Sequence, residues 1–161
     1  MLKRVVVLSA AWIGFATVGL AQQVPGVSAP DAIAARQASL DMSSITFRSM
    51  GDAMKAGREA KSQAYPAASL AKWAKALPGM FPPGTGQGET SADTQARVEV
   101  WKDRAGFERA AANYAAATAR LAEMAEANDT AGFTKQLDQV NQACAICHGS
   151  YKAGAQGPPR K

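Results

Sequence analysis

The two cysteines and the one histidine of this chain lie within five residues, in the segment CAICH at positions 144–148. On a helix, Cys144 and Cys147 are three residues apart and share a face, and His148 follows four residues after Cys144. Two thiols on one face can add to the two vinyl groups of a haem, and the adjacent imidazole, a good iron ligand when neutral, can then bind the metal. The segment therefore predicts one covalently attached haem c with His148 as an axial iron ligand.

Two other kinds of site use a pair of cysteines at this spacing. A zinc site needs four ligands in a closed shell, whereas this chain has no Cys or His outside the segment. A thiol-redox pair usually follows a strand in an α/β pattern, and the sequence shows no such pattern. A redox protein without haem stays an open alternative, which would require that the purified protein carries no haem.

The first residues have the composition of a secretory signal peptide. Lys3 and Arg4 precede an apolar run at positions 5–20, and small residues end the run before a polar pair of glutamines. This pattern predicts cleavage after Ala21, while a membrane anchor would need a longer apolar run. We expect residues 22–161 to form one exported, periplasmic domain with no membrane span. The net charge is +5 with acidic and basic residues intermixed, so we expect no nucleic-acid partner.

The remaining sequence is rich in alanine with intervening charged and amide residues, which indicates an all-α protein. We expect helices at residues 31–57, 62–77, 94–127 and 131–153, a Pro/Gly-rich loop at 77–90 and a disordered tail from about residue 154. Apolar stripes on four helices predict an antiparallel four-helix bundle that encloses one haem. Because the stripes contain many alanines, helices packed directly together would bury little apolar area, and a large flat group would fill the core. Arg36 is the charged residue on the buried face of the first helix.

Several segments, together with the position of CAICH on the last helix, resemble the class II c-type cytochromes, the cytochrome c′ family. They are ARQASL at 35–40, ALPGMFPPGTG at 76–86, GET at 88–90 and EVW at 99–101 followed by Phe107. The resemblance covers nearly the whole chain after residue 21. It implies that Cys144 and Cys147 hold one haem c covalently and that His148 is the proximal iron ligand.

The resemblance also implies which other residues surround the haem. Arg36 and Gln37 match a pair on the first helix that contacts the haem near its propionates, which would give the inward cation an anionic partner. Glu89 and Thr90 match a loop pair beside the haem edge. The family also implies a homodimer formed through the first two helices.

The residue across the iron from His148 decides the function that the resemblance implies. In the family this distal residue lies four positions after the first-helix arginine, which is Leu40 here, and an aliphatic residue there implies five-coordinate iron that binds NO or CO and transfers single electrons. The chain has no second histidine for this position. Met42 should point about 200° away from Leu40 around the helix. A kink in that helix would bring Met42 inward, so a low-spin, Met-ligated carrier of the c-556 type, which shuttles electrons between periplasmic redox partners, stays an alternative. No acid–base pair is apparent at this position, so we expect an electron-transfer or gas-binding protein and not an enzyme.

Overall fold

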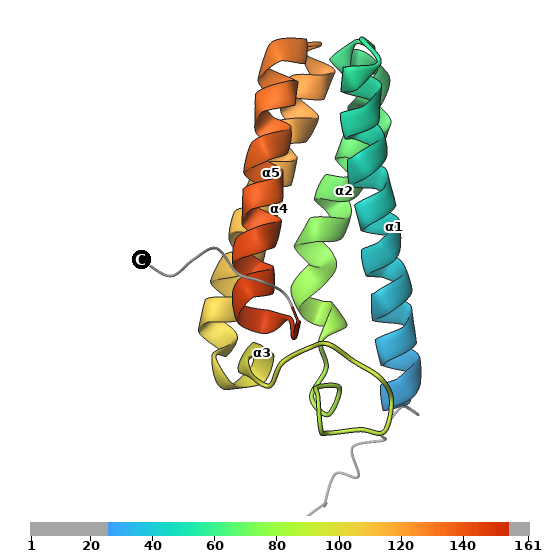
Figure 1. The fold of residues 1–161 in the computed structure, drawn as a ribbon, viewed down its shortest axis with the longest axis vertical. Helices are drawn as coiled ribbons and strands as arrows, with labels where there is room; N and C mark the ends of the chain where they lie inside the picture. The colour runs from blue at the N-terminus through green and yellow to red at the C-terminus, as the bar shows by residue number, and fades with distance from the viewer. Residues whose placement is uncertain (1–25, 155–161) are drawn as a thin grey trace, which may run out of the picture.

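The computed structural model describes residues 26–154, and the predicted signal peptide at 1–21 and the tail at 155–161 lie outside the described residues. Four long helices run alternately up and down the molecule: α1 (Ala29–Lys55), α2 (Ala64–Ala76), α4 (Arg104–Glu126) and α5 (Thr130–Tyr151) (Figure 1). Short 3-10 turns η1 (Ala60–Gln63) and η2 (Leu77–Met80) and a one-turn helix α3 (Glu99–Lys102) lie in the connections. The predicted all-α antiparallel four-helix bundle is confirmed. Within residues 26–154, no helix combines the length and hydropathy needed to cross a membrane.

The third predicted helix begins later than expected and is interrupted. The sequence predicted one helix at 94–127, whereas helical structure begins at Glu99 and breaks at Asp103, whose backbone has φ −113° and ψ 54°. The Asp103 carboxylate caps α4 by accepting a hydrogen bond of 3.1 Å from the Gly106 N–H. A side chain that binds nearby backbone in this way competes with helix propagation. The connecting loop therefore extends over residues 81–98 and is longer than predicted.

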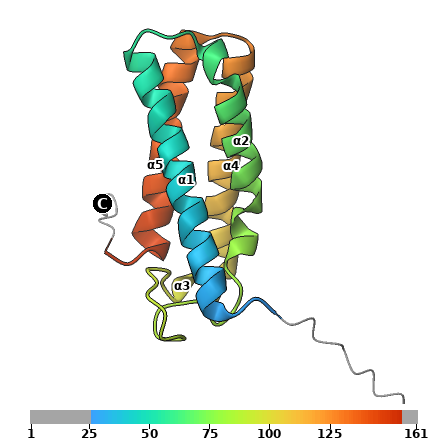
Figure 2. The same cartoon turned by 90° about the vertical axis from the view of Figure 1, so that its right-hand side faces the viewer.

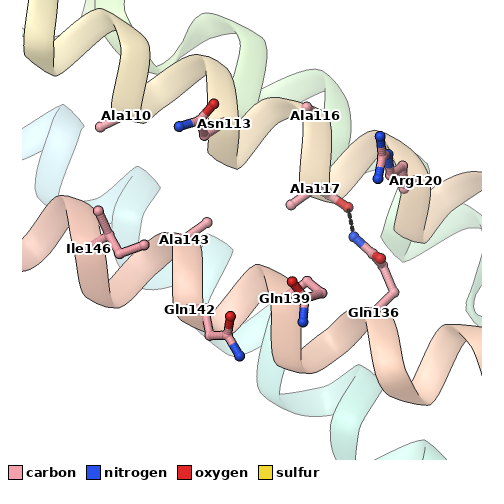
Figure 3. Close-up of a pocket in the computed structure, with 10 residues that line it drawn as sticks. All are labelled: Ala110, Asn113, Ala116, Ala117, Arg120, Gln136, Gln139, Gln142, Ala143 and Ile146. Carbon is pink, nitrogen blue, oxygen red and sulfur yellow. Dashed lines mark hydrogen bonds between the residues drawn. The ribbon is translucent and has the colours of Figure 1, made fainter. Parts of the chain in front are cut away.

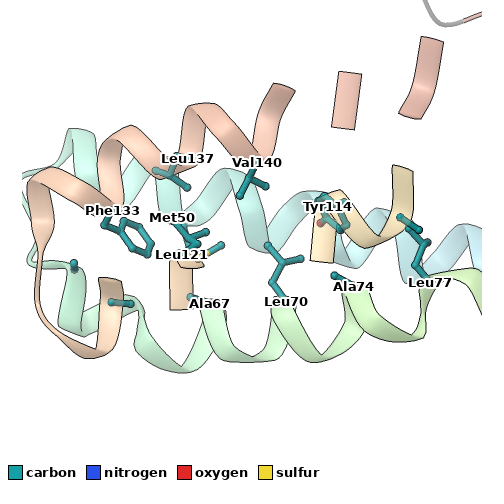
Figure 4. Packing of buried hydrophobic residues seen from close by; sticks show 13 residues of the cluster. Met50, Ala67, Leu70, Ala74, Leu77, Tyr114, Leu121, Phe133, Leu137 and Val140 are labelled. Atoms are coloured by element: carbon teal, nitrogen blue, oxygen red, sulfur yellow. The ribbon is translucent and has the colours of Figure 1, made fainter. Parts of the chain in front are cut away.

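The four long helices do not pack equally. Helix α4 packs extensively along both α2 and α5, whereas α1 makes only a few contacts with α5. Figure 2 shows α1 crossing in front of α5, with α2 and α4 at the other side of the bundle. The largest fully buried side chains of the main cluster, Met50, Leu121, Phe133 and Val140, occupy the half of the bundle where α5 begins (Figure 4). Helix α1 thus contributes Met50 to this apolar packing near its C-terminal end, and it buries Ile33 near its N-terminal end.

The loop at 81–98 is attached to the C-terminal end of α5. The Arg97 N–H donates to the Tyr151 carbonyl at 3.0 Å, and the Ala153 N–H donates to the Gln95 carbonyl at 2.8 Å. The Tyr151 hydroxyl donates to the Asp103 carboxylate at 2.8 Å. These contacts fix the last turn of α5, directly after the CAICH segment, at the same end of the bundle as the start of α1 (Figure 1).

Replacement of Gly106 by alanine should destabilise the protein. A Cβ at this position would lie 2.0 Å from one Asp103 carboxylate oxygen and 2.5 Å from the Tyr151 hydroxyl. The carboxylate would have to leave its cap, which costs about 1–2 kcal/mol in the free energy of unfolding measured by chemical denaturation. Gly51→Ala is the control, because Gly51 lies inside α1 with nothing within 4 Å of its added Cβ. This control should gain about 0.5–1 kcal/mol, and equal effects of the two changes would contradict the packing described for Gly106.

Candidate functional site

The CAICH segment lies in the last two turns of α5. Cys144 and Cys147 are free, half-buried thiols, and Cys144 packs against the main buried cluster. His148 is exposed, although neighbouring atoms partly desolvate its ring, and this desolvation together with the Lys152 charge lowers the pKa of His148. The imidazole is therefore neutral at pH 7, which is the form that binds a metal ion. Among residues 26–154, no group of three or more His, Cys, Asp or Glu side chains could hold a metal ion by itself.

The two thiols differ from those of a thiol-redox centre. Burial, with a smaller contribution from the neighbouring Cys147, raises the pKa of Cys144 to about 11. Burial also raises the pKa of Cys147. Redox cysteines need a lowered pKa, because the thiolate is the reactive form. The environment of these cysteines therefore does not favour the thiol-redox alternative.

Arg36 is buried in α1 at 3% exposure and is surrounded by oxygen atoms of the following loop. Its guanidinium donates to the Thr85 hydroxyl at 2.9 Å, to the Thr85 carbonyl at 3.0 Å and to the Thr94 hydroxyl at 2.9 Å. A longer contact of 3.4 Å reaches the Met80 carbonyl. The cation also lies 4.5 Å from the centroid of the Phe81 ring. Arg36 thus attaches α1 to the loop through neutral groups, and burial lowers its pKa.

The expected anionic partner of Arg36 is not a carboxylate of the described residues. Each of its four hydrogen bonds goes to a hydroxyl or carbonyl oxygen. The guanidinium N–H groups therefore have acceptors, but these acceptors do not neutralise the positive charge. A buried charge is stabilised further by an opposite charge close by. The carboxylates of a haem would supply that charge, so Arg36 and the donor set of α5 both fit the group. Sequence reasoning missed Thr85 and Thr94, because no local pattern pairs them with a residue 49 or 58 positions earlier.

The three other polar residues predicted at the site belong to the same loop or bind it. The exposed Gln37 amide donates to the Asp93 carbonyl at 3.0 Å, so α1 holds the loop at a second point. The Glu89 carboxylate accepts from the Gly86 N–H at 2.9 Å, and the Thr90 hydroxyl accepts from the backbone N–H two residues later. These contacts stabilise the loop itself, and the contacts of the three residues with a haem stay predictions.

Leu40 and Met42 point in the directions predicted from the helix period. Leu40 is half-buried and packs, from α1, against the same cluster that Cys144 contacts from α5. Met42 is 62% exposed, and Met50 is fully buried in the cluster. Leu40 therefore faces the core of the bundle, whereas Met42 faces solvent.

A separate groove lies between α4 and α5 (Figure 3). Its volume is about 330 Å³, and amide side chains and alanines form most of its lining. One of these amides, Gln136, donates to the Ala117 carbonyl at 2.9 Å. None of the residues Cys144, Cys147 and His148 lines the groove, although Ile146 of the same segment does.

Replacement of Arg36 by lysine should destabilise the protein although the charge is retained. An ammonium cannot reproduce the planar fork that reaches both threonines, and each lost bond from a charged donor costs about 1.5–3 kcal/mol. We expect a loss of about 2–4 kcal/mol in the free energy of unfolding measured with urea. The matched control is Arg48→Lys, an exposed position on the same helix, which should stay within about 0.5 kcal/mol of the unsubstituted protein. A loss no larger than that of the control would show that Arg36 does not hold the loop.

Comparison with known proteins assigns the family. A profile of the family described as cytochrome C′ matches residues 31–152. Cytochrome c′ of Rhodospirillum rubrum is 30% identical over 119 residues, which are 73% of this chain and 79% of the relative. The crystal structure of cytochrome c′ from Rubrivivax gelatinosus is similar with a TM-score of 0.69 and 28% identity, over 77% of this chain and 96% of that one.

A further solved structure shares the fold. It is the nitric oxide complex of a variant of cytochrome c prime from Alcaligenes xylosoxidans, with a TM-score of 0.69 and 23% identity, over 78% of this chain and 96% of that one. The profile covers most of the chain, including both Arg36 on α1 and the CAICH segment on α5. The chain therefore belongs to the cytochrome c′ family, whose members carry one covalently bound haem c.

Proposed function

We propose that this protein is a periplasmic cytochrome that holds five-coordinate haem iron open to small gases such as NO and CO, and that it also transfers single electrons. The observation that carries the proposal is the distal side. Leu40, which has no lone pair to donate to iron, packs towards the core from α1, and Met42 is 62% exposed on the other side of that helix. An open axial position is what distinguishes a gas-binding haem from a Met-ligated electron carrier.

The attachment residues of this proposal are Cys144, Cys147 and His148. The two free thiols lie one helical turn apart on α5, and the neighbouring imidazole is held neutral. Bound there, the haem supplies an iron that binds diatomic gases and changes between its ferric and ferrous states. Cys144 packs against the main buried cluster and Cys147 is half-buried, so both attachment points are partly shielded from bulk water, whereas His148 is exposed.

The polar residues of α1 and the loop would bind the acidic edge of the haem. Arg36 keeps its positive charge beside neutral partners only, which supports its role as the partner of a propionate. Gln37, Glu89 and Thr90 lie in or against the same loop and complete this edge in the proposal. Their task is to orient the haem and not to react with it.

The chemistry of the Leu40 side chain also supports the proposal that the iron binds NO and CO. An aliphatic distal side chain donates no hydrogen bond to bound dioxygen, so NO and CO are the favoured ligands. A relative of the same fold, from Alcaligenes xylosoxidans, has been solved as a nitric oxide complex. The Met-ligated electron carrier is the less favoured alternative, because Met50 is buried in the far half of the bundle and Met42 faces solvent.

Location and partners complete the proposal. The predicted signal peptide, which lies outside the described residues, supports export to the periplasm and redox partners there. Met42 and Ile45 lie three residues apart on α1 and are both exposed, which supports a homodimer formed through the first two long helices. Apolar side chains that are exposed together often mark a protein interface.

The visible spectrum should reveal the coordination of the iron. We expect high-spin spectra for the ferric and ferrous protein, and a shift of the ferrous Soret band when CO is added, because Leu40 leaves the sixth position open. Met42→Leu is the control and should leave all three spectra unchanged, since Met42 faces solvent. Sharp low-spin bands that are indifferent to CO in the unsubstituted protein, and that are lost in Met42→Leu, would establish the Met-ligated carrier in place of this proposal.

Covalent attachment should depend on both cysteines. In Cys144→Ala and in Cys147→Ala the haem keeps one thioether, so the α-band of the reduced pyridine complex should move to longer wavelength while the haem stays with the denatured chain. The double variant should release its haem on denaturation. Ile146→Ala is the matched control, because Ile146 lies between the two cysteines and is 59% exposed. Unchanged α-bands in both single variants would contradict the assignment of the thioether residues.

A further inference from the structure

We propose that Trp73 and Ser39 are positioning residues that hold the turn of α1 carrying Leu40, and that they thereby set how fast a gas reaches the iron. This inference rests on the proposed function, in which Leu40 lies over an open axial position. Neither residue belongs to the set that the sequence predicted for the site. Both are half-buried, and they come from neighbouring helices of the bundle.

The Ser39 hydroxyl connects α1 to two points on the next segment of the chain. The Trp73 indole N–H donates a hydrogen bond to this hydroxyl. The hydroxyl in turn donates to the Met80 sulfur at 3.5 Å. A serine hydroxyl has one hydrogen to donate, so Ser39 uses it on Met80 while a lone pair receives Trp73. One side chain thus links α1 to α2 and to the end of η2.

Met80 is held by the same turn of α1 a second time. Its carbonyl accepts the 3.4 Å contact from Arg36, which lies three residues before Ser39 on the same face of the helix. The turn at 36–40 is therefore bound to Met80 through both the backbone and the side chain of that residue. Leu40 follows Ser39 directly, so a movement of this turn moves Leu40 with it.

The Trp73 ring is itself held in position by packing against a buried aromatic residue of α4. It meets the Tyr114 ring edge to face, with centroids 6.2 Å apart and an interplanar angle of 86°. Tyr114 is buried in α4, and α2 and α4 pack extensively against each other. The hydrogen bond from Trp73 therefore ties this turn of α1 to a side chain that α4 supports in turn.

The hydrogen bonds of the turn at 36–40 affect how easily a gas reaches the iron. A gas that binds the open position has to displace Leu40 or pass beside it, and the turn at 36–40 resists that displacement as long as its hydrogen bonds persist. Removal of one ordinary hydrogen bond makes a local opening more frequent by roughly threefold to tenfold. Ser39 and Trp73 should therefore slow gas association without touching the gas.

The test compares single variants of the haem-loaded, ferrous protein by CO recombination after flash photolysis. Ser39→Ala and Trp73→Phe should each speed CO association by about threefold to tenfold, which is the factor for the loss of one hydrogen bond. Ser39→Thr keeps the hydroxyl and should retain the original rate. Ser49→Ala is the matched control on the same helix, because its hydroxyl binds only the Thr46 carbonyl one turn earlier.

A second readout does not depend on gas binding. Hydrogen–deuterium exchange of the backbone amides at residues 36–43 should be faster in Ser39→Ala and Trp73→Phe than in Ser49→Ala, because α1 opens locally when it loses its anchor. Normal CO rates and normal exchange in both variants would overturn the proposal. A lower melting temperature with an unchanged CO rate would also overturn it, since Ser39 and Trp73 would then only stabilise the fold.

Leu40→Ala separates the failure of this inference from the failure of the proposed function. Removal of most of the side chain should speed CO association more than Ser39→Ala does, if Leu40 lies over the iron. A rate unchanged in Leu40→Ala would overturn the distal assignment and the inference that rests on it. A faster rate in Leu40→Ala, with no effect of Ser39→Ala or Trp73→Phe, would leave the distal assignment standing and overturn the inference alone.

Discussion

The burial of one guanidinium group organises the site end of this bundle. Arg36 is almost fully removed from water, so its N–H groups need oxygen partners close by, and the loop at 81–98 and the end of η2 supply them. The same loop is bound through its far end to Tyr151 and Ala153, directly after the CAICH segment. The buried cation of Arg36 thereby fixes the loop at 81–98, which joins the start of α1 to the end of α5.

The four long helices of the bundle pack unequally against one another. Large apolar side chains such as Met50 and Phe133 fill the half where α5 begins, and α4 is packed between α2 and α5. Towards the other end Leu40 and Cys144 are half-buried against this cluster, while Ile33 of α1 and Phe107 of α4 are fully buried. Hydrogen bonds from Arg36 and Ser39 join α1 to the connecting segment at that end.

Much of this arrangement follows from local patterns in the sequence. The 3.6-residue period placed Arg36 on the buried face of the first helix and Met42 on the exposed one, and the structure confirms both. The break at Asp103 was not predicted, because its carboxylate serves as a helix cap and also accepts from Tyr151, which lies 48 residues away. Thr94 was assigned to the start of a helix, whereas its hydroxyl is engaged by Arg36 and its segment stays a loop.

The sequence by itself determined the all-α bundle, the faces of its helices and the grouping of two thiols and an imidazole on one helical turn, because each depends on residues within one or two turns of each other. Only the tertiary structure decided which oxygens receive Arg36 and that Trp73 and Met80 both meet Ser39. These partners lie 34 to 58 residues apart along the chain. Such pairs form only when whole helices and the loop have packed, and no local spacing of residue types encodes that packing.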